Sequence, residues 1–191
     1  MPIKVAAAPK SAMKLFRTGI EKHLAAGLVD ATLGQIEGLG APHRVFHLGL
    51  DALVGDTPIA KAAKHVGWRA QLVDRKKNAV AAAELALTRA GLRFACVSRG
   101  PHAASGQGEA AAERWSREAK GEHELTLLRI PGAYCTALWL RSRDGTRDAF
   151  VPIAPCPPNL RPNTAYGESE LRTALLPEAR KQLAGPSEDA R

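Results

Sequence analysis

Three side chains of metal-ligand type recur at a spacing of four residues, namely His43, His47 and Asp51. On a helix this spacing would align two imidazoles and a carboxylate along one stripe, where they could approach one metal ion. The Val-Phe pair between the histidines favours a strand instead, on which both histidines share a face without converging. The sequence leaves helix and strand open over residues 43–51, and we expect neither a bound metal nor a cofactor.

A glycine-rich segment at residues 99–108 follows an apolar run and precedes a helical pattern. Free backbone N–H groups at such a junction can bind phosphate, with Arg99, His102 and Ser105 as polar side chains and His102 as an acid or base. The segment matches neither the Walker loop nor the GxGxxG fingerprint. Glu109 also places a competing negative charge at the same helix end. A surface loop is therefore the simpler interpretation.

The sequence offers little for nucleophilic catalysis. Cys135 lies in an alternating apolar run, where a cysteine is usually a small buried hydrophobe with an inert thiol. No GxSxG elbow occurs. The three cysteines, Cys96, Cys135 and Cys156, are odd in number and widely spaced, which argues against a disulfide framework or a thiolate zinc site. A reducing compartment is the simplest interpretation.

The charge balance favours an anionic partner. The chain has 27 Lys and Arg against 19 Asp and Glu, a net charge of +8. Residues 44–100 hold ten of the basic side chains and only four acidic ones. A phosphate-tracking surface with one stacking aromatic is one interpretation, and an ordinary solvated surface is the other. The contact residues expected for the first are Lys61, Lys64, Trp68, Arg69, Arg75, Lys76, Lys77, Arg99 and Ser105.

Residues 59–68 are similar in pattern to the first helix and turn of a helix-turn-helix module. A DNA-reading module would need a second helix to start near Arg69. Residues 68–73 favour a strand instead, so this is a minor hypothesis.

Several elements would have to position these groups. Apolar residues four apart, from Phe16 to Leu28, predict a helix that Ser11 caps. A capping Asp56 and Pro58 in the first turn predict a second helix. Residues 68–98 have the pattern of a strand, a helix and a second strand. Such a unit usually places its two strands parallel to each other. The expected helices are 11–29, 58–66, 77–90, 109–120 and 169–183, the last kinked or broken at Pro177; the expected strands before residue 100 are 43–50, 68–73 and 92–98.

Residues 123–154 predict an antiparallel meander. Side chains alternate along 134–141, with Thr136, Leu138 and Leu140 on one face. Cys135 and Trp139 lie on the other face and are expected in the core. Asp144-Gly145 suits a tight hairpin turn, and Pro152 belongs at a sheet edge or a strand end.

The fold expected from these elements is a single α/β or α+β domain with a mixed sheet of about five or six strands. β-α-β units would be followed by a C-terminal antiparallel meander and flanked by N- and C-terminal helices. The expected parts are an N-terminal helical arm over 1–43, a mixed-sheet core over 44–165, and a C-terminal helix with a disordered tail over 166–191.

Three functions remain open. The first is a basic cytoplasmic binding or assembly protein without enzymatic activity, whose anionic partner is a nucleic acid or an acidic protein surface. The second is a small enzyme acting on an anionic or phosphorylated molecule at residues 99–108. The third is a structural subunit of a homo-oligomer or larger assembly. No apolar run approaches the length of a membrane span, so no membrane partner is expected.

Overall fold

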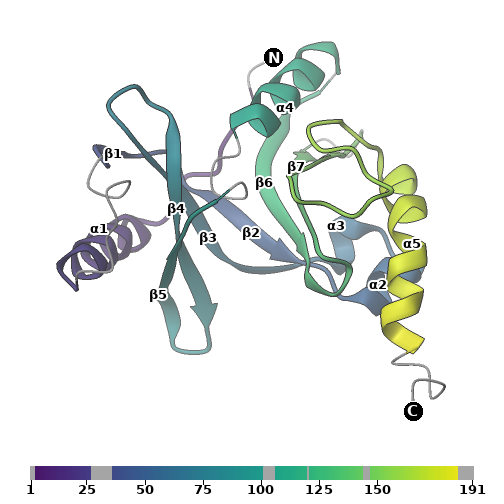
Figure 1. Ribbon diagram of the computed structural model, residues 1–191, viewed down its shortest axis with the longest axis horizontal. Helices are drawn as coiled ribbons and strands as arrows, with labels where there is room; N and C mark the ends of the chain where they lie inside the picture. Colours follow the sequence, from purple (N-terminus) through teal and green to yellow (C-terminus); the bar gives the residue numbers. More distant parts are fainter. Residues whose placement is uncertain (1–2, 27–35, 101–105, 120, 144–146, 185–191) are drawn as a thin grey trace.

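The computed structural model describes residues 3–26, 36–100, 106–119, 121–143 and 147–184. Within these ranges eight strands form one sheet in the order β5-β4-β3-β2-β6-β7-β8, with β1 beside β3 (Figure 1). The pair β2 and β6 is parallel, and the other strand pairs in these ranges are antiparallel. The strands are β1 Gly38–Leu39, β2 His43–His47, β3 Lys64–Val73, β4 Ala79–Thr88, β5 Gly91–Ser98, β6 His123–Ile130, β7 Cys135–Ser142 and β8 Ala149–Pro152.

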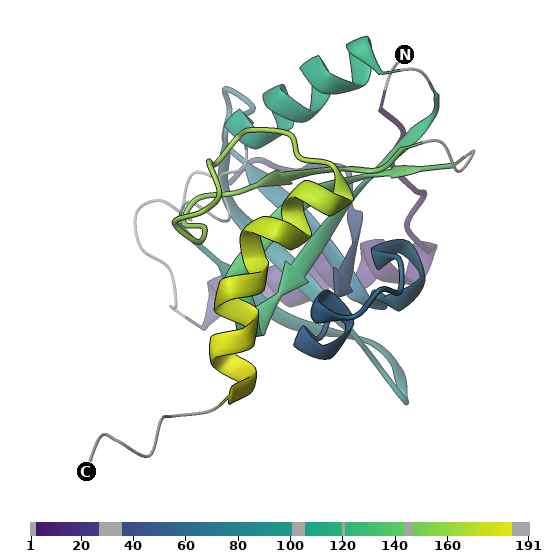
Figure 2. The ribbon, with the colours of Figure 1, turned by 90° about the vertical axis from the view of Figure 1, so that its right-hand side faces the viewer.

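The helices cover the sheet from several sides. They are α1 Lys10–Ala25, α2 Leu50–Val54, α3 Ile59–Ala62, α4 Gly106–Glu118 and α5 Glu168–Ala184, with a 3-10 turn, η2, at Pro131–Ala133. Figure 1 shows α1 beside β3–β5 and α5 at the opposite end, and in Figure 2 α5 crosses the near side below α4. The predicted mixed sheet with N- and C-terminal flanking helices is confirmed, although it has more strands than expected. Of the helices in the described ranges, none has the length and apolar character that crossing a membrane requires.

The antiparallel meander is confirmed as β6, β7 and β8. Leu138 and Leu140 pack on the side of α4, whereas Ala137 and Trp139 pack on the side of α2 and α5. Cys135 and Trp139 are buried, as predicted. Pro152 lies in β8, the last strand of the sheet. The predicted turn at 144–145 and the tail at 185–191 lie outside the described residues.

The helix predicted over residues 77–90 is wrong, because most of this segment is strand β4. The strand forms antiparallel pairs with β3 and β5, so the expected parallel β-α-β unit is a pair of hairpins. Ala81, Ala82 and Ala83 are fully buried on both faces of the sheet. Alanine favours helices in isolation, but tertiary packing overrides that weak preference. Small side chains suit this strand because α1 packs directly on it.

The helix predicted over residues 58–66 is confirmed only in part. It ends at Ala62, and strand β3 begins at Lys64. The same strand occupies the place where a recognition helix would lie, so the helix-turn-helix hypothesis is wrong. Residues 68–72 alternate between apolar and polar side chains, and this strand pattern outweighs the helix preference of Lys64 and Ala70, because both edges of the strand pair with other strands.

The two terminal helices also differ from expectation. The first begins at Lys10 with no side-chain cap, so the predicted capping role of Ser11 is wrong. The last helix continues through Pro177 without a break. A proline costs one hydrogen bond and some bending in a helix interior, and burial of Leu171, Leu175 and Ala179 against the meander compensates for it.

Arg172 on α5 holds the segment that contains α2 and α3 against α5 through hydrogen bonds. Its guanidinium donates hydrogen bonds to the carbonyl oxygens of Leu53, at 2.6 Å, Gly55, at 2.7 Å, and Thr57. Glu168, one turn earlier on α5, accepts a hydrogen bond from the Ile59 N–H at 2.9 Å, at the start of α3. These contacts satisfy backbone groups that a helix end leaves unpaired, and they hold the two short helices against α5.

Helix α1 packs on β3–β5 through a very close approach. Ala12 and Phe16 are fully buried against this part of the sheet. A Cβ atom added to Gly19 would lie 2.0 Å from Cδ2 of Phe94 on β5. The aromatic ring therefore lies directly on the helix backbone, and only glycine fits there.

We expect Gly19→Ala to destabilise the protein despite the better helix propensity of alanine. Overpacking costs about 1–3 kcal/mol, and propensity returns about 1 kcal/mol. Because the added Cβ would lie only 2.0 Å from the ring, the cost is at the upper end of that range, and the unfolding free energy from urea titration should fall by about 1–2 kcal/mol. Thr18→Ala, at the exposed neighbouring position, is the control and should leave stability unchanged or slightly higher. A Gly19→Ala variant as stable as its control would contradict the close packing of Phe94.

Candidate functional site

A row of polar side chains crosses four neighbouring strands of the sheet. Cys96 on β5 is opposite Glu84 on β4, Glu84 is opposite Arg69 on β3, and Arg69 is opposite His43 on β2. Directly opposed residues share a face, so the four side chains lie on one side of the sheet. Arg69 is only 1% exposed, which makes this row the most strongly buried charged feature in the described part of the chain.

Glu84 is shared by two arginines. Arg129 on β6 donates two hydrogen bonds to its carboxylate, one of them 2.8 Å from Nη1 to Oε2, and Nη1 of Arg69 lies 3.7 Å from Oε1. Burial alone would raise the pKa of Glu84, but the hydrogen bonds and charge of Arg129 and the charge of Arg69 outweigh it and lower this pKa. The carboxylate stays ionised at neutral pH, and the arrangement resembles a structural ion pair more than an acid-base group.

The candidate metal ligands do not come together. His43 and His47 lie in strand β2, which decides between the helix and the strand left open by the sequence, whereas Asp51 lies in α2. Burial, reinforced by the charge of Arg69, lowers the pKa of His43 to about 4, and burial followed by the charge of Arg129 lowers that of His47. Both imidazoles are neutral at pH 7. Among the described residues, no group of three or more side chains could hold a metal ion.

The cysteines are poor nucleophiles. Burial raises the pKa of Cys135 to about 12, and burial also raises the pKa values of Cys96 and Cys156. A thiol reacts through its thiolate, and at neutral pH these three are protonated. The expectation that Cys135 is a packed core residue agrees with this environment.

The basic residues predicted to contact an anion are spread apart. Lys61 lies in α3 and Lys64 at the start of β3, and residues 75–77 lie in the turn after the end of this strand. Ten strand residues separate the two groups by about 33 Å at 3.3 Å per residue. Trp68 and Arg69, midway along the strand, are buried. These side chains therefore do not present one continuous surface.

The glycine-rich segment is described only at its ends. Arg99 is exposed, and helix α4 begins at Gly106, within the segment. His102 and Ser105 lie outside the described residues, so the phosphate-binding hypothesis for this segment stays a prediction. Glu109, in the first turn of α4, accepts a hydrogen bond from the Gln71 amide of β3 at 2.5 Å. That contact anchors the start of the helix on the sheet.

A groove that the sequence did not reveal lies between α1 and β5. Its volume is about 410 Å³. One wall is the side of α1, and the other is the edge of β5, where half-buried Phe94 supplies an apolar surface. The lining residues are Leu15, Thr18, Gly19, Lys22, His23, Ala26, Phe94 and Ala95.

Cations lie both in the wall of this groove and on the exposed surface of α1 outside it. Lys22 lies on its wall, and Lys10, Lys14 and Arg17 follow one another four and three residues apart on the exposed side of α1. This spacing places them side by side on the helix surface. Within the ranges that the structure describes, none of the four takes part in an ion pair, whereas Arg44, Arg75, Arg129 and Arg172 are all bound to carboxylates. The helical period of residues 10–22 is visible in the sequence, where it predicts the buried stripe but does not show which cations lack ion-pair partners.

Comparison of the chain with models of protein families, with curated proteins and with solved structures finds no match. Function must therefore be argued from the chemistry of these sites alone.

His43 should make folding stability depend on pH between about 4 and 6.5. The folded-state pKa lies below the unfolded one, so the unfolded chain binds the extra proton in this window and stability falls as the pH is lowered. At about 1.4 kcal/mol per pKa unit the full loss is about 3 kcal/mol. Urea titrations of the native protein and of His43→Gln at pH 7, 5.5 and 4.5 measure it. If the unfolding free energies of the two proteins changed by the same amount between these pH values, His43 would not be the group that titrates.

Glu84→Gln should leave Arg69 as a buried charge with a weakened partner. Breaking a buried ion pair from one side costs about 3–5 kcal/mol, so the unfolding free energy should fall by about 3 kcal/mol at pH 7. Because the pKa of Glu84 is lowered in the folded state, the difference is fully present above pH 4.5 and shrinks in more acidic solution. Glu113→Gln, which removes the exposed pair with Arg117, is the control and should cost less than about 1 kcal/mol. Equal effects of the two variants would refute the buried role of Glu84.

Proposed function

We propose that this protein is a non-enzymatic binding protein for an anionic polymer, and that single-stranded nucleic acid is the partner. The observation that supports it most directly is the groove between α1 and β5, which has Lys22 in its wall and further cations without ion-pair partners on the adjoining outer surface of α1. The net charge of +8 is consistent with such a partner. The proposal keeps the class of partner expected from the sequence, but it moves the contact surface from residues 61–77 to helix α1.

The chemistry of the groove favours a single strand over a duplex or an acidic protein. Non-specific single-strand binding combines cations that follow the phosphates with apolar or aromatic surfaces on which bases pack. Lys22 in the groove wall, with Lys14 and Arg17 on the outer surface of α1, supplies the first, and Leu15 with Phe94 supplies the second. An acidic protein surface would use the cations without needing the apolar wall.

The absence of an activated group in the described residues supports binding over catalysis. The cysteine pKa values are raised, the Glu84 carboxylate is held by two arginines, and His43 is buried and neutral. A catalytic nucleophile or base needs a pKa that matches its task. The alternative of an enzyme acting at residues 99–108 has no such support among the described side chains.

The affinity for a labelled oligothymidylate of twelve nucleotides, measured by fluorescence anisotropy, tests the proposal. Binding should weaken steeply between 50 and 200 mM salt because cations are released from the strand. The triple reversal Lys14→Glu, Arg17→Glu and Lys22→Glu should lower the affinity at least tenfold. The logarithm of the association constant falls linearly with the logarithm of the salt concentration, and each phosphate contact contributes about 0.7 to that slope. Loss of three contacts should therefore reduce the slope by about 2.

The matched control changes the same amount of charge elsewhere. Lys61→Glu, Lys64→Glu and Lys76→Glu alter three cations that the sequence predicted to bind the anion, but that lie in α3, at the start of β3 and in the turn after β3. This variant should retain most of the binding if the groove is the site. Equal losses of affinity in both variants would show that binding depends on the net charge of the protein and not on a site at α1. Salt-insensitive binding, or none by the native chain, would overturn the proposed function itself.

A further inference from the structure

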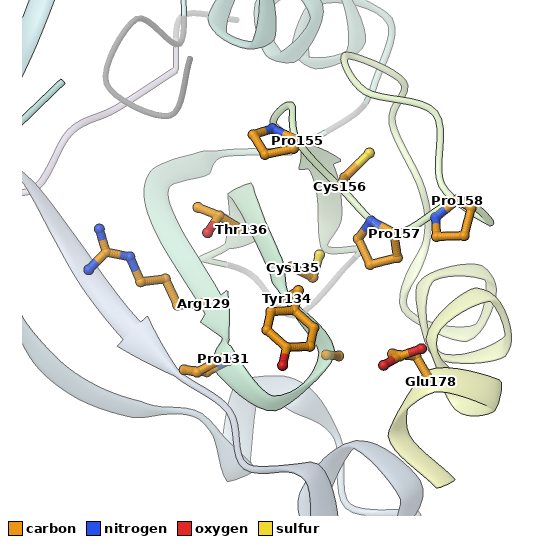
Figure 3. Close-up of a pocket in the computed structure, with 11 residues that line it drawn as sticks. Arg129, Pro131, Tyr134, Cys135, Thr136, Pro155, Cys156, Pro157, Pro158 and Glu178 are labelled. Atoms are coloured by element: carbon orange, nitrogen blue, oxygen red, sulfur yellow. The ribbon is translucent and has the colours of Figure 1, made fainter. Parts of the chain in front are cut away.

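A second, larger pocket lies at the far end of the molecule from α1. Its volume is about 560 Å³, within the range of sites that take small organic ligands. It forms where the β6–β7 connection, the segment at 155–158 and helix α5 meet (Figure 3). None of the residues predicted from the sequence to bind an anion lines it, so it is independent of the proposed nucleic-acid surface.

The walls of this pocket are apolar and stiff. Four of the lining residues are prolines, at positions 131, 155, 157 and 158. Proline fixes one backbone dihedral, so such walls lose little freedom when a ligand binds. A hydrogen bond of 2.9 Å from the Leu160 N–H to the Pro157 carbonyl oxygen closes the turn after the prolines, and Cys156 donates its thiol to the Leu160 carbonyl oxygen at 3.4 Å. The pocket is therefore preformed.

Tyr134 brings an aromatic ring to the pocket. Its side chain is 71% exposed, the highest value among the large hydrophobic side chains that the structure describes as exposed. It was predicted to begin the strand, but it ends η2 in a left-handed conformation with φ 50°, and β7 starts one residue later. Such a conformation is uncommon for a residue with a side chain and concentrates at functional sites. The turn holds the ring out of the core, where it can contact a ligand.

Two charged side chains line the pocket, and one of them forms no ion pair among the described residues. Arg129 lines it, but the guanidinium is bound to Glu84. Glu178 of α5 accepts a hydrogen bond of 2.8 Å from the neutral amide of Gln182, and it forms no ion pair among the described residues. Figure 3 shows its carboxylate projecting from α5 toward the end of the hairpin that carries Tyr134. Glu178 thus gives the pocket a carboxylate without an ion-pair partner, although the chain as a whole is strongly basic.

We propose that this pocket binds a small molecule that joins a cationic amine to an apolar, planar body. Glu178 pairs with the ammonium group, and the electron-rich face of Tyr134 adds a cation–π contact. The prolines contact the apolar body. A ligand anion is disfavoured because it would have to compete with Glu84 for Arg129.

Three probes with the same phenyl ring and ethyl chain test the proposal on the full chain. Phenethylamine is cationic, 2-phenylethanol is neutral and phenylacetate is anionic. Titrations followed by ¹H–¹³C NMR of the tyrosine ring and the Thr136 methyl group should show phenethylamine binding at least tenfold more tightly than the other two. Tighter binding of phenylacetate would overturn the proposal and assign the pocket to an anion held by Arg129. Equal binding of all three, or no binding of any, would also overturn it.

Glu178→Gln is the decisive variant because it removes the charge and keeps the shape of a partly exposed side chain. It should weaken phenethylamine binding at least tenfold and leave 2-phenylethanol unchanged. Tyr134→Leu should weaken phenethylamine binding severalfold through loss of the cation–π contact. Glu21→Gln on α1 is the control and should have no effect on any probe. Unchanged phenethylamine binding in Glu178→Gln would refute the role of this carboxylate, whatever the outcome of the oligothymidylate experiment.

Discussion

The carboxylate of Glu84, held between Arg69 and Arg129, is the interaction on which the arrangement of the sheet depends. Glu84 lies on β4 and Arg129 on β6, and the strands β3 and β2 lie between them. The ion cluster therefore connects the hairpins β3–β5 to the meander β6–β8 across the middle of the sheet. Removing charges from water is costly, and hydrogen bonds from Arg129 with the nearby charge of Arg69 offset that cost. The same cluster occupies Arg129, which otherwise would give the neighbouring pocket a positive charge.

The two sides of this connection carry unpaired charges of opposite sign. Helix α1, packed on β3–β5 through Gly19 and Phe94, carries cations without carboxylate partners. The pocket beside β7 and α5 carries the carboxylate of Glu178 without a cation. Figure 1 shows α1 and α5 at opposite ends of the molecule. In the two proposals, one sheet thus separates a surface that binds an anion from a cavity that binds a cation.

How far the candidate sites could be predicted differs between them. The cations of α1 follow a helical period that was visible in the sequence, but their significance depends on which other cations are neutralised by carboxylates. Arg69 and Trp68 were expected to contact an anion, yet β2 and β4 flank the strand that carries them and both side chains are buried. The pocket was not predictable at all, because Tyr134, Pro157 and Glu178 come from three separate segments.

The sequence alone determined the elements whose signals are local. The alternation along residues 135–142 predicts β7, and the apolar stripe from Phe16 to Leu24 predicts α1, because each pattern reflects one buried face of one element. Tertiary structure alone decided that the alanine-rich residues 79–88 form a strand, since the space under α1 admits only small side chains. It also decided which charges are paired, because Glu84 and Arg129 are 45 residues apart and meet only across the folded sheet.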